Sequence, residues 1–200
     1  MKKGNLNTNP NSKIGAVYRS IYTEVFYVMG NFFKGGHIRI CQRSMDREPL
    51  IELVLFDFGG VLAEEGFRNG LLAIAEKNGR SPREFLKEAT DLILSTGYLT
   101  GQAQENSFWD AVRKKAGIQG SDQELRNEIL SRFAVRDWMF DLVRQLRAQK
   151  IQTAILSDQT NWLDELEAQH DFFKHFDRVF NSYHFHKSKH DPTLFDDVLR

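Results

Sequence analysis

The feature that most constrains the fold is a set of short apolar runs, each closed by polar residues and separated from the next by helical segments. These runs cover residues 51–56 (IELVLF), 151–156 (IQTAIL) and 177–180 (DRVF). Short apolar runs of this kind are typical of strands buried in a parallel sheet. Their alternation with helices predicts an α/β fold with a Rossmann-like parallel sheet and right-handed crossovers.

A long helical block separates the first two runs. Apolar positions recur at helical spacing in residues 66–77, 82–95, 105–116, 121–133 and 138–149, and a further helix is expected at residues 161–169. Ser81-Pro82 is a helix start signal, and Ser121 with Glu124 has the spacing of a capping box. Such a block between two neighbouring strands predicts a helical insert in the sheet domain.

Composition excludes several classes of protein. The chain has 200 residues, with 27 basic and 27 acidic side chains and 41% hydrophobic residues, which suits one globular domain with an insert. A formal net charge of zero provides no basic surface for nucleic acid. The apolar stretch at residues 14–33 contains Arg19 and Glu24, so no membrane span is expected. A lone Cys41 and the absence of a signal-like start favour the cytoplasm.

Candidate chemistry gathers at the carboxyl ends of the expected strands. Asp57 follows the first run, Ser157 the second, and Lys189 lies in the loop after the third. Ligands of parallel sheets bind beyond these ends, so the three side chains are expected at one rim. Taken singly, each also has a plain structural interpretation: a turn for Asp57, a helix N-cap for Ser157 and a solvated loop for Lys189.

The functional interpretation of these residues is phosphoryl chemistry. An aspartate can form a covalent intermediate, and the neighbouring glycines let the backbone approach an anion. A serine hydroxyl with the following N–H groups can hold a phosphate, and a lysine can neutralise the charge of a transition state. Asp57-Phe58-Gly59 also spells the magnesium-binding triplet of protein kinases, but no other kinase motif precedes it.

The order of the three motifs resembles the haloacid dehalogenase (HAD) superfamily, specifically its phosphatase-like members with a helical cap. Residues 53–62 (LVLFDFGGVL), 155–162 (ILSDQTNW) and 181–195 (NSYHFHKSKHDPTLF) resemble the first, second and third motifs. The resemblance implies an incomplete HAD-like core at residues 49–64 and 137–200, with the last strands missing. It also implies a helical cap at residues 65–136. Residues 1–48 then form an N-terminal extension, and one interpretation places this extension outside the domain.

The resemblance also implies roles for individual residues. Asp57 is the expected nucleophile, which forms an aspartyl-phosphate that water hydrolyses, and Lys189 is the second catalytic residue. Mg²⁺ is expected on the Asp57 carboxylate and the Gly59 carbonyl. The expected substrate contacts are Ser157, Asp158, Gly60 and Asn161. The implied substrate is a small phosphorylated metabolite; the sequence specifies neither its identity nor an oligomeric state.

Three departures from the family pattern affect this interpretation. Gly59 stands where the family has a second aspartate, which predicts an acid–base step weaker by about 10²- to 10⁴-fold if nothing replaces it. His186 and His190 replace a glycine and a proline of the third motif. The fourth motif, an acidic pair after another strand, is expected beyond Arg200. Without that strand the run at 51–56 becomes an edge, which predicts poor solubility or cover by the N-terminal segment.

Two other functions remain open at this stage. A carbon–halogen hydrolase of the same fold also uses an aspartate nucleophile and needs no magnesium. A catalytically silent, truncated domain would account for the missing acidic residues. The histidines His184, His186 and His190 alternate on one segment and suggest a transition-metal site, for which no fourth ligand is evident.

Overall fold

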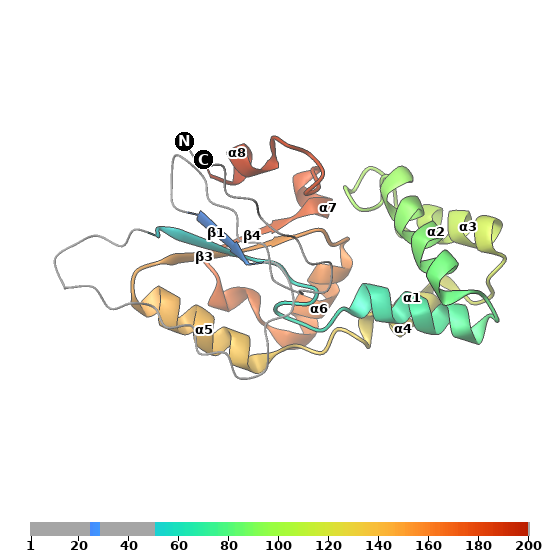
Figure 1. The fold of residues 1–200 in the computed structure, drawn as a ribbon, viewed down its shortest axis with the longest axis horizontal. Coiled ribbons are helices and arrows are strands. Elements are labelled where there is room, and N and C mark those ends of the chain that lie inside the picture. Colours follow the sequence, from blue (N-terminus) through green and yellow to red (C-terminus); the bar gives the residue numbers. More distant parts are fainter. Residues whose placement is uncertain (1–24, 29–50, 200) are drawn as a thin grey trace, which may run out of the picture.

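A four-stranded parallel sheet forms the centre of the molecule in the computed structural model, which describes residues 25–28 and 51–199 (Figure 1). The strands β1 (Val25–Val28), β2 (Leu53–Phe56), β3 (Gln152–Ser157) and β4 (Arg178–Asn181) lie in that order. Neighbouring strands are all parallel, so their carboxyl ends meet at one edge of the sheet. The expected α/β fold is thereby confirmed.

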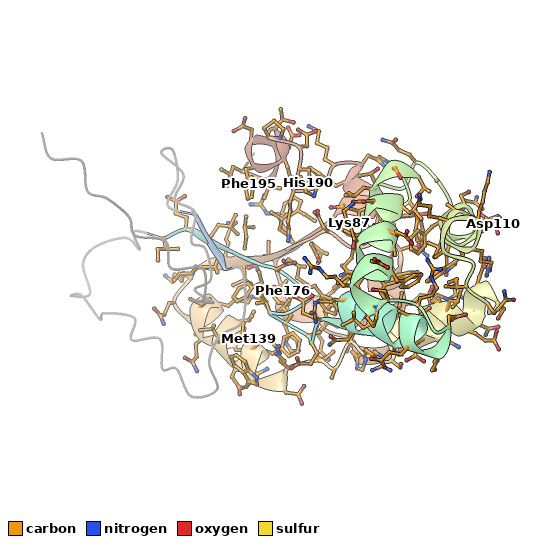
Figure 2. All side chains as sticks on the ribbon, turned by 45° about the vertical axis from the view of Figure 1, so that its right-hand side comes forward. Lys87, Asp110, Met139, Phe176, His190 and Phe195 are labelled. Carbon is orange, nitrogen blue, oxygen red and sulfur yellow. The ribbon has the colours of Figure 1, made fainter. Side chains whose placement is uncertain are left out.

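The alternation of side chains along β2 divides the core between the two faces of the sheet. Val54 and Phe56 pack on the face covered by α5 (Asp137–Ala148) and α6 (Trp162–His170), whereas Leu53 and Leu55 pack on the opposite face. The second face is covered by α8 (Leu194–Val198). Figure 2 shows Phe176 and Met139 on the α5 side of the sheet and Phe195 on the α8 side.

Four helices pack mainly on one another and form a group at the carboxyl edge of the sheet (Figure 1). They are α1 (Gly66–Lys77), α2 (Pro82–Ser95), α3 (Glu105–Ala116) and α4 (Asp122–Leu130). The bounds expected for α1, α2 and α3 are confirmed, whereas α4 ends before the expected residue 133. The division of the chain into core and cap domains stays a prediction.

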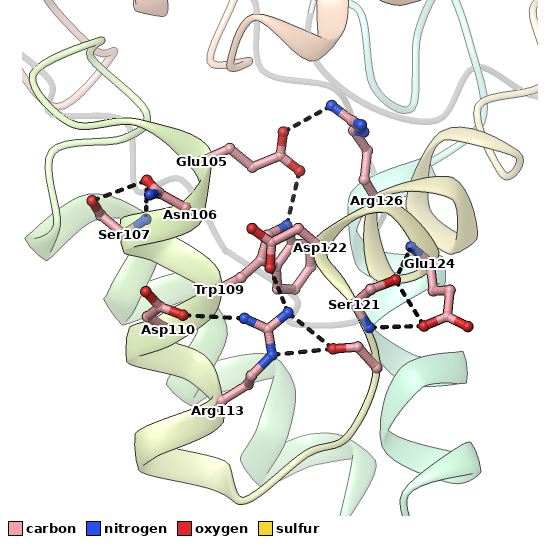
Figure 3. A network of polar contacts seen from close by, with 11 residues as sticks. Glu105, Asn106, Ser107, Trp109, Asp110, Arg113, Ser121, Asp122, Glu124 and Arg126 are labelled. Carbon is pink, nitrogen blue, oxygen red and sulfur yellow. Dashed lines mark hydrogen bonds and ion pairs between the residues drawn. The ribbon is translucent and has the colours of Figure 1, made fainter.

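A polar network ties the helical group together and joins it to the sheet domain. Glu105 accepts hydrogen bonds from the Trp109 indole at 2.9 Å and from Arg126 at 3.0 Å (Figure 3). The same guanidinium lies 3.2 Å from Glu165 on α6, so one arginine links α3, α4 and the sheet domain. The predicted capping box of Ser121 and Glu124 is present at the start of α4 (Figure 3).

Some elements were not specified by the sequence patterns. The 3₁₀-helix η1 (Phe173–His175) and the short helix α7 (Ser182–Phe185) flank β4. Strand β1 pairs in parallel with β2, in register Val25↔Leu53 to Val28↔Phe56, and so covers the edge that the sequence left open. Cys41 and the segments flanking β1 lie outside the described residues. No helix of the described part of the chain is long and apolar enough to cross a membrane.

Candidate active site

The position of Asp57 is fixed by the two aromatic residues on either side of it. Phe56 and Phe58 are fully buried, and alternation along the chain turns the Asp57 side chain away from them, to the carboxyl edge of the sheet. The Phe58 ring stacks on Phe172 at 5.0 Å and lies 5.6 Å from Phe133, between centroids. The residues on both sides of Asp57 are therefore anchored in the aromatic core.

A tight turn follows the aspartate. The Gly60 N–H donates to the Ala63 carbonyl at 2.8 Å, and the Ala63 N–H donates to the Phe58 carbonyl at 2.9 Å. Gly60 has φ +79°, and a Cβ there would lie 2.3 Å from Oε1 of Glu65. The positive φ favours glycine, since other residues rarely adopt it, and a Cβ would also displace the end of the Glu65 side chain.

Ser157 and Lys189 both reach the Asp57 carboxylate. Nζ of Lys189 lies 2.8 Å from Oδ2, and Oγ of Ser157 donates to Oδ1 at 3.4 Å. The Phe58 N–H also donates to Oδ1, at 2.8 Å. Ser157 is buried and the two charged side chains are only 15% and 21% exposed, so the charges face each other in a site largely shielded from water.

Asp158 holds the loop that carries the lysine. Its Oδ1 accepts hydrogen bonds from the Ser182 hydroxyl at 2.6 Å and from the Lys189 backbone N–H at 2.9 Å. In the same loop His186 adopts φ +57°, the left-handed conformation that favours glycine. Asp158, predicted as a substrate contact, thus also positions Lys189.

Asn161, another predicted substrate contact, forms a hydrogen bond to a residue of the helical group. Its Oδ1 accepts a hydrogen bond of 2.7 Å from the hydroxyl of Tyr98, a fully buried residue in the loop after α2. Burial raises the pKa of Tyr98, so its hydroxyl remains a donor at neutral pH. The ring of His186 contacts the Thr100 carbonyl at 2.8 Å in the same loop. The helical group therefore rests on the rim beside Asp57.

The two connections between the sheet and the helical group run side by side next to the site. Ala63 and Val135 form an antiparallel bridge, and the Arg136 N–H donates to the Leu62 carbonyl at 2.8 Å. The Arg136 guanidinium binds the Gly60 carbonyl at 2.5 Å and the Glu64 carboxylate at 3.0 Å. One arginine thus ties the turn after Asp57 to the return connection.

Glu65 is a site residue that the sequence patterns did not single out. Its carboxyl lies against the turn after Asp57, within 3.6 Å of the position that a Cβ of Gly59 would take. Burial of the carboxyl and the nearby Asp57 charge raise the pKa of Glu65, although the residue as a whole is exposed. A glutamate just before a helix has an ordinary helix-start interpretation, so no local signal marked it.

The oxygen donors that the sequence assigned to magnesium are one carboxylate, Asp57, and one carbonyl, Gly59. Mg²⁺ prefers oxygen ligands and is commonly held by one or two carboxylates together with substrate phosphate and water, so this donor set fits the ion in kind. Within residues 51–199, no group of three or more His, Cys, Asp or Glu side chains is placed to hold a metal. Two of the histidines that suggested a transition-metal site have other partners: the ring of His184 contacts the Asp164 carboxylate at 2.6 Å, and that of His186 contacts the Thr100 carbonyl at 2.8 Å.

Comparison with known proteins identifies the fold. No protein-family model matches the sequence, and no curated protein sequence matches it. The structure is similar to a HAD family enzyme of Bacteroides thetaiotaomicron solved with magnesium and inorganic phosphate, with a TM-score of 0.56 and 22% identity over 74% of this chain and 77% of that chain. It is also similar to a predicted HAD-like hydrolase of Porphyromonas gingivalis, with a TM-score of 0.57 and 19% identity over 74% of this chain and 75% of that chain.

A third similar structure is the L-2-haloacid dehalogenase of Xanthobacter autotrophicus with chloropropionic acid covalently bound. The TM-score is 0.51 and the identity 18%, over 74% of this chain and 65% of that chain. These likenesses show that the chain has the haloacid-dehalogenase-like fold. The resemblance indicated by the three sequence motifs is thereby confirmed at the level of the fold.

Proposed function

We propose that the chain is a hydrolase of phosphate monoesters that acts through an aspartyl-phosphate on Asp57. The observation that carries this proposal is the convergence of Lys189 and Ser157 on the two oxygens of one carboxylate, at 2.8 and 3.4 Å. A carboxylate beside a fixed cation and a hydroxyl is suited to attack an anionic centre, because the cation offsets the charge repulsion.

In this mechanism the residues of the chain have separate tasks. An oxygen of Asp57 attacks phosphorus, Lys189 and Ser157 hold the phosphoryl oxygens, and Asp158 keeps the lysine loop in place through its bonds to Ser182 and the Lys189 N–H. Gly60, another predicted substrate contact, forms the tight turn beside the nucleophile, where its N–H is held by the Ala63 carbonyl. Magnesium, held by Asp57 and the Gly59 carbonyl, would neutralise phosphate charge. The helical group, which rests on Asn161 through Tyr98, would exclude water and select a small phosphorylated metabolite.

The experiment is turnover of 4-nitrophenyl phosphate by the purified chain, with and without magnesium, beside Asp57→Asn. The proposal expects magnesium-dependent turnover that Asp57→Asn abolishes, since an amide is no nucleophile here. No turnover by a folded chain would overturn it in favour of a catalytically silent domain.

A second candidate is hydrolysis of a carbon–halogen bond by the same aspartate. The Asp57–Lys189 ion pair favours this candidate, because the lysine already supplies a positive charge beside the carboxylate and the reaction needs no magnesium. Release of halide from a 2-haloacid without magnesium, and no phosphatase turnover, would support this alternative.

A further inference from the structure

The carboxyl group of Glu65 lies on the side of the Gly59–Gly60 turn from which side chains at these two positions would begin. A Cβ built on Gly59 would lie 3.6 Å from Oε2 of Glu65 and 3.7 Å from Nε2 of Gln159, and a Cβ on Gly60 would lie 2.3 Å from Oε1. The Glu65 carboxyl thus lies close against Gly60, and a Cβ at position 59 would be in ordinary van der Waals contact with it. That group lies beside the turn that begins at the candidate nucleophile.

Helix capping does not account for this placement. Glu65 is the N-cap residue of α1, but its side chain makes no capping hydrogen bond. Within residues 51–199 its carboxyl has no hydrogen-bond or ion-pair partner, whereas the adjacent Glu64 pairs with Arg136 at 3.0 Å. A carboxyl that lies near the charge of Asp57 without such a partner costs stability, and arrangements of this kind are characteristic of functional sites.

We propose that Glu65 is the general acid and general base of the hydrolysis at Asp57, an inference that rests on the function proposed above. The role needs a group that can both give and take a proton beside the nucleophile. Lys189 is held by Asp57 itself, and Gln159 does not titrate. His184 and His186 contact Asp164 and Thr100. Of the neighbours of the Gly59–Gly60 turn, Glu65 is the group suited to both transfers.

The two steps close as a cycle. First, an oxygen of Asp57 bonds to phosphorus, the ester P–O bond breaks, and the leaving oxygen takes its proton from the Glu65 carboxyl, which releases an alcohol. Next, the Glu65 carboxylate takes a proton from water, whose oxygen bonds to phosphorus while the P–O bond to Asp57 breaks. Phosphate leaves, Asp57 is again a carboxylate, and Glu65 is again protonated.

The electrostatics of the site support this assignment. Burial and the Asp57 charge raise the pKa of Glu65, the charges of Arg68, Arg136 and Lys189 lower it, and the net shift is upward, the direction that favours the protonated carboxyl. A general acid is most effective when its pKa is close to the working pH.

The test compares wild type, Glu65→Gln and the control Glu76→Gln, which removes an exposed carboxylate from α1. With 4-nitrophenyl phosphate the leaving group needs no proton, so Glu65→Gln should keep the initial burst of nitrophenolate while steady-state turnover falls about 10²- to 10⁴-fold. With ethyl phosphate, both the burst and the steady state should fall. The control should match wild type on both substrates.

Each other outcome has a distinct meaning. Wild-type turnover by Glu65→Gln on both substrates would overturn the role of Glu65 and leave that of Asp57 intact. Loss of the nitrophenolate burst in a folded Glu65→Gln chain would also overturn the acid–base role, because that burst needs no proton donor. Absence of turnover by wild type would overturn the function of Asp57 and the role of Glu65 together.

Discussion

Nζ of Lys189 lies 2.8 Å from Oδ2 of Asp57, although the two residues belong to distant parts of the chain. Strands β2, β3 and β4 bring them together, since all three end at one edge of the sheet. The other carboxylate oxygen, Oδ1, accepts hydrogen bonds from the Ser157 hydroxyl and the Phe58 N–H. The lysine thus both orients the carboxylate and brings a positive charge to the place where a phosphoryl group would bind.

Replacement of the lysine tests this relationship. Lys189→Met should lower kcat for 4-nitrophenyl phosphate by about 10²- to 10³-fold, because a fixed charge that stabilises the transition state is lost. Lys187→Met is the matched control, since Lys187 lies in the same loop but pairs with Asp197 and Thr193 rather than with Asp57. Equal activity of Lys189→Met and the control would refute the assigned role.

The positioning role of Asp158 can be separated from direct contact with substrate. Asp158→Ala removes the acceptor for the Ser182 hydroxyl and the Lys189 N–H, so we expect kcat to fall about 10- to 100-fold as the lysine shifts. Asp158→Asn keeps a carbonyl acceptor and should recover most of the activity. If the asparagine variant is as slow as the alanine variant, the negative charge itself is required and the positioning account is wrong.

The aromatic anchor of Asp57 should dominate local stability. Phe58→Ala removes a fully buried ring stacked on Phe172 and should lower the free energy of unfolding by about 3–5 kcal/mol, measured by urea titration. Trp138→Ala is a suitable control, because that side chain is 49% exposed and its loss should change stability by about 0.5 kcal/mol or less. Similar losses in both variants would contradict the anchoring role.

The raised pKa of Glu65 makes stability depend on pH in a defined direction. Its pKa in the folded chain exceeds the ordinary value of 4.5, so the folded state binds the proton more tightly than the unfolded state. The stability that protonation contributes is fully present below pH 4.5 and is lost as the pH rises through the folded pKa. Glu65→Gln should therefore be more stable than wild type at neutral pH, with a difference that shrinks at acidic pH.

Thermal unfolding of the two chains across this pH range provides the measurement. Glu76→Gln is again the control and should follow wild type throughout. A Glu65→Gln chain that is less stable than wild type at neutral pH would show that the carboxylate makes a favourable structural contact. Greater stability combined with slower turnover is expected of a group placed for function.

The order of strands and helices from β2 onward, and the meeting of the three candidate residues at one edge, could be predicted because their signals are local. Apolar runs identify β2 and β3, and the parallel topology then places Asp57 and Ser157 at the same edge. Helical periodicity likewise locates α1 and α3 with their observed bounds. Such inferences need only the spacing of residues along one segment.

Other features depend on contacts between distant segments and carry no local signal. The packing of Glu65 against Gly59 depends on how the chain turns after β2, and the Tyr98–Asn161 hydrogen bond depends on how the helical group meets the rim. An open edge at β2 predicted either poor solubility or cover by the N-terminal segment, without specifying which; the pairing of β1 with β2 provides the cover. In each case the sequence indicates the residue type but not its partner.

The central claim, covalent catalysis by Asp57, is tested most directly by mass spectrometry of acid-quenched protein after mixing with 4-nitrophenyl phosphate and magnesium. We expect a single phosphoryl group on the peptide that contains Asp57, more of it in Glu65→Gln and none in Asp57→Asn. Turnover that proceeds without this adduct and persists in Asp57→Asn would contradict the account.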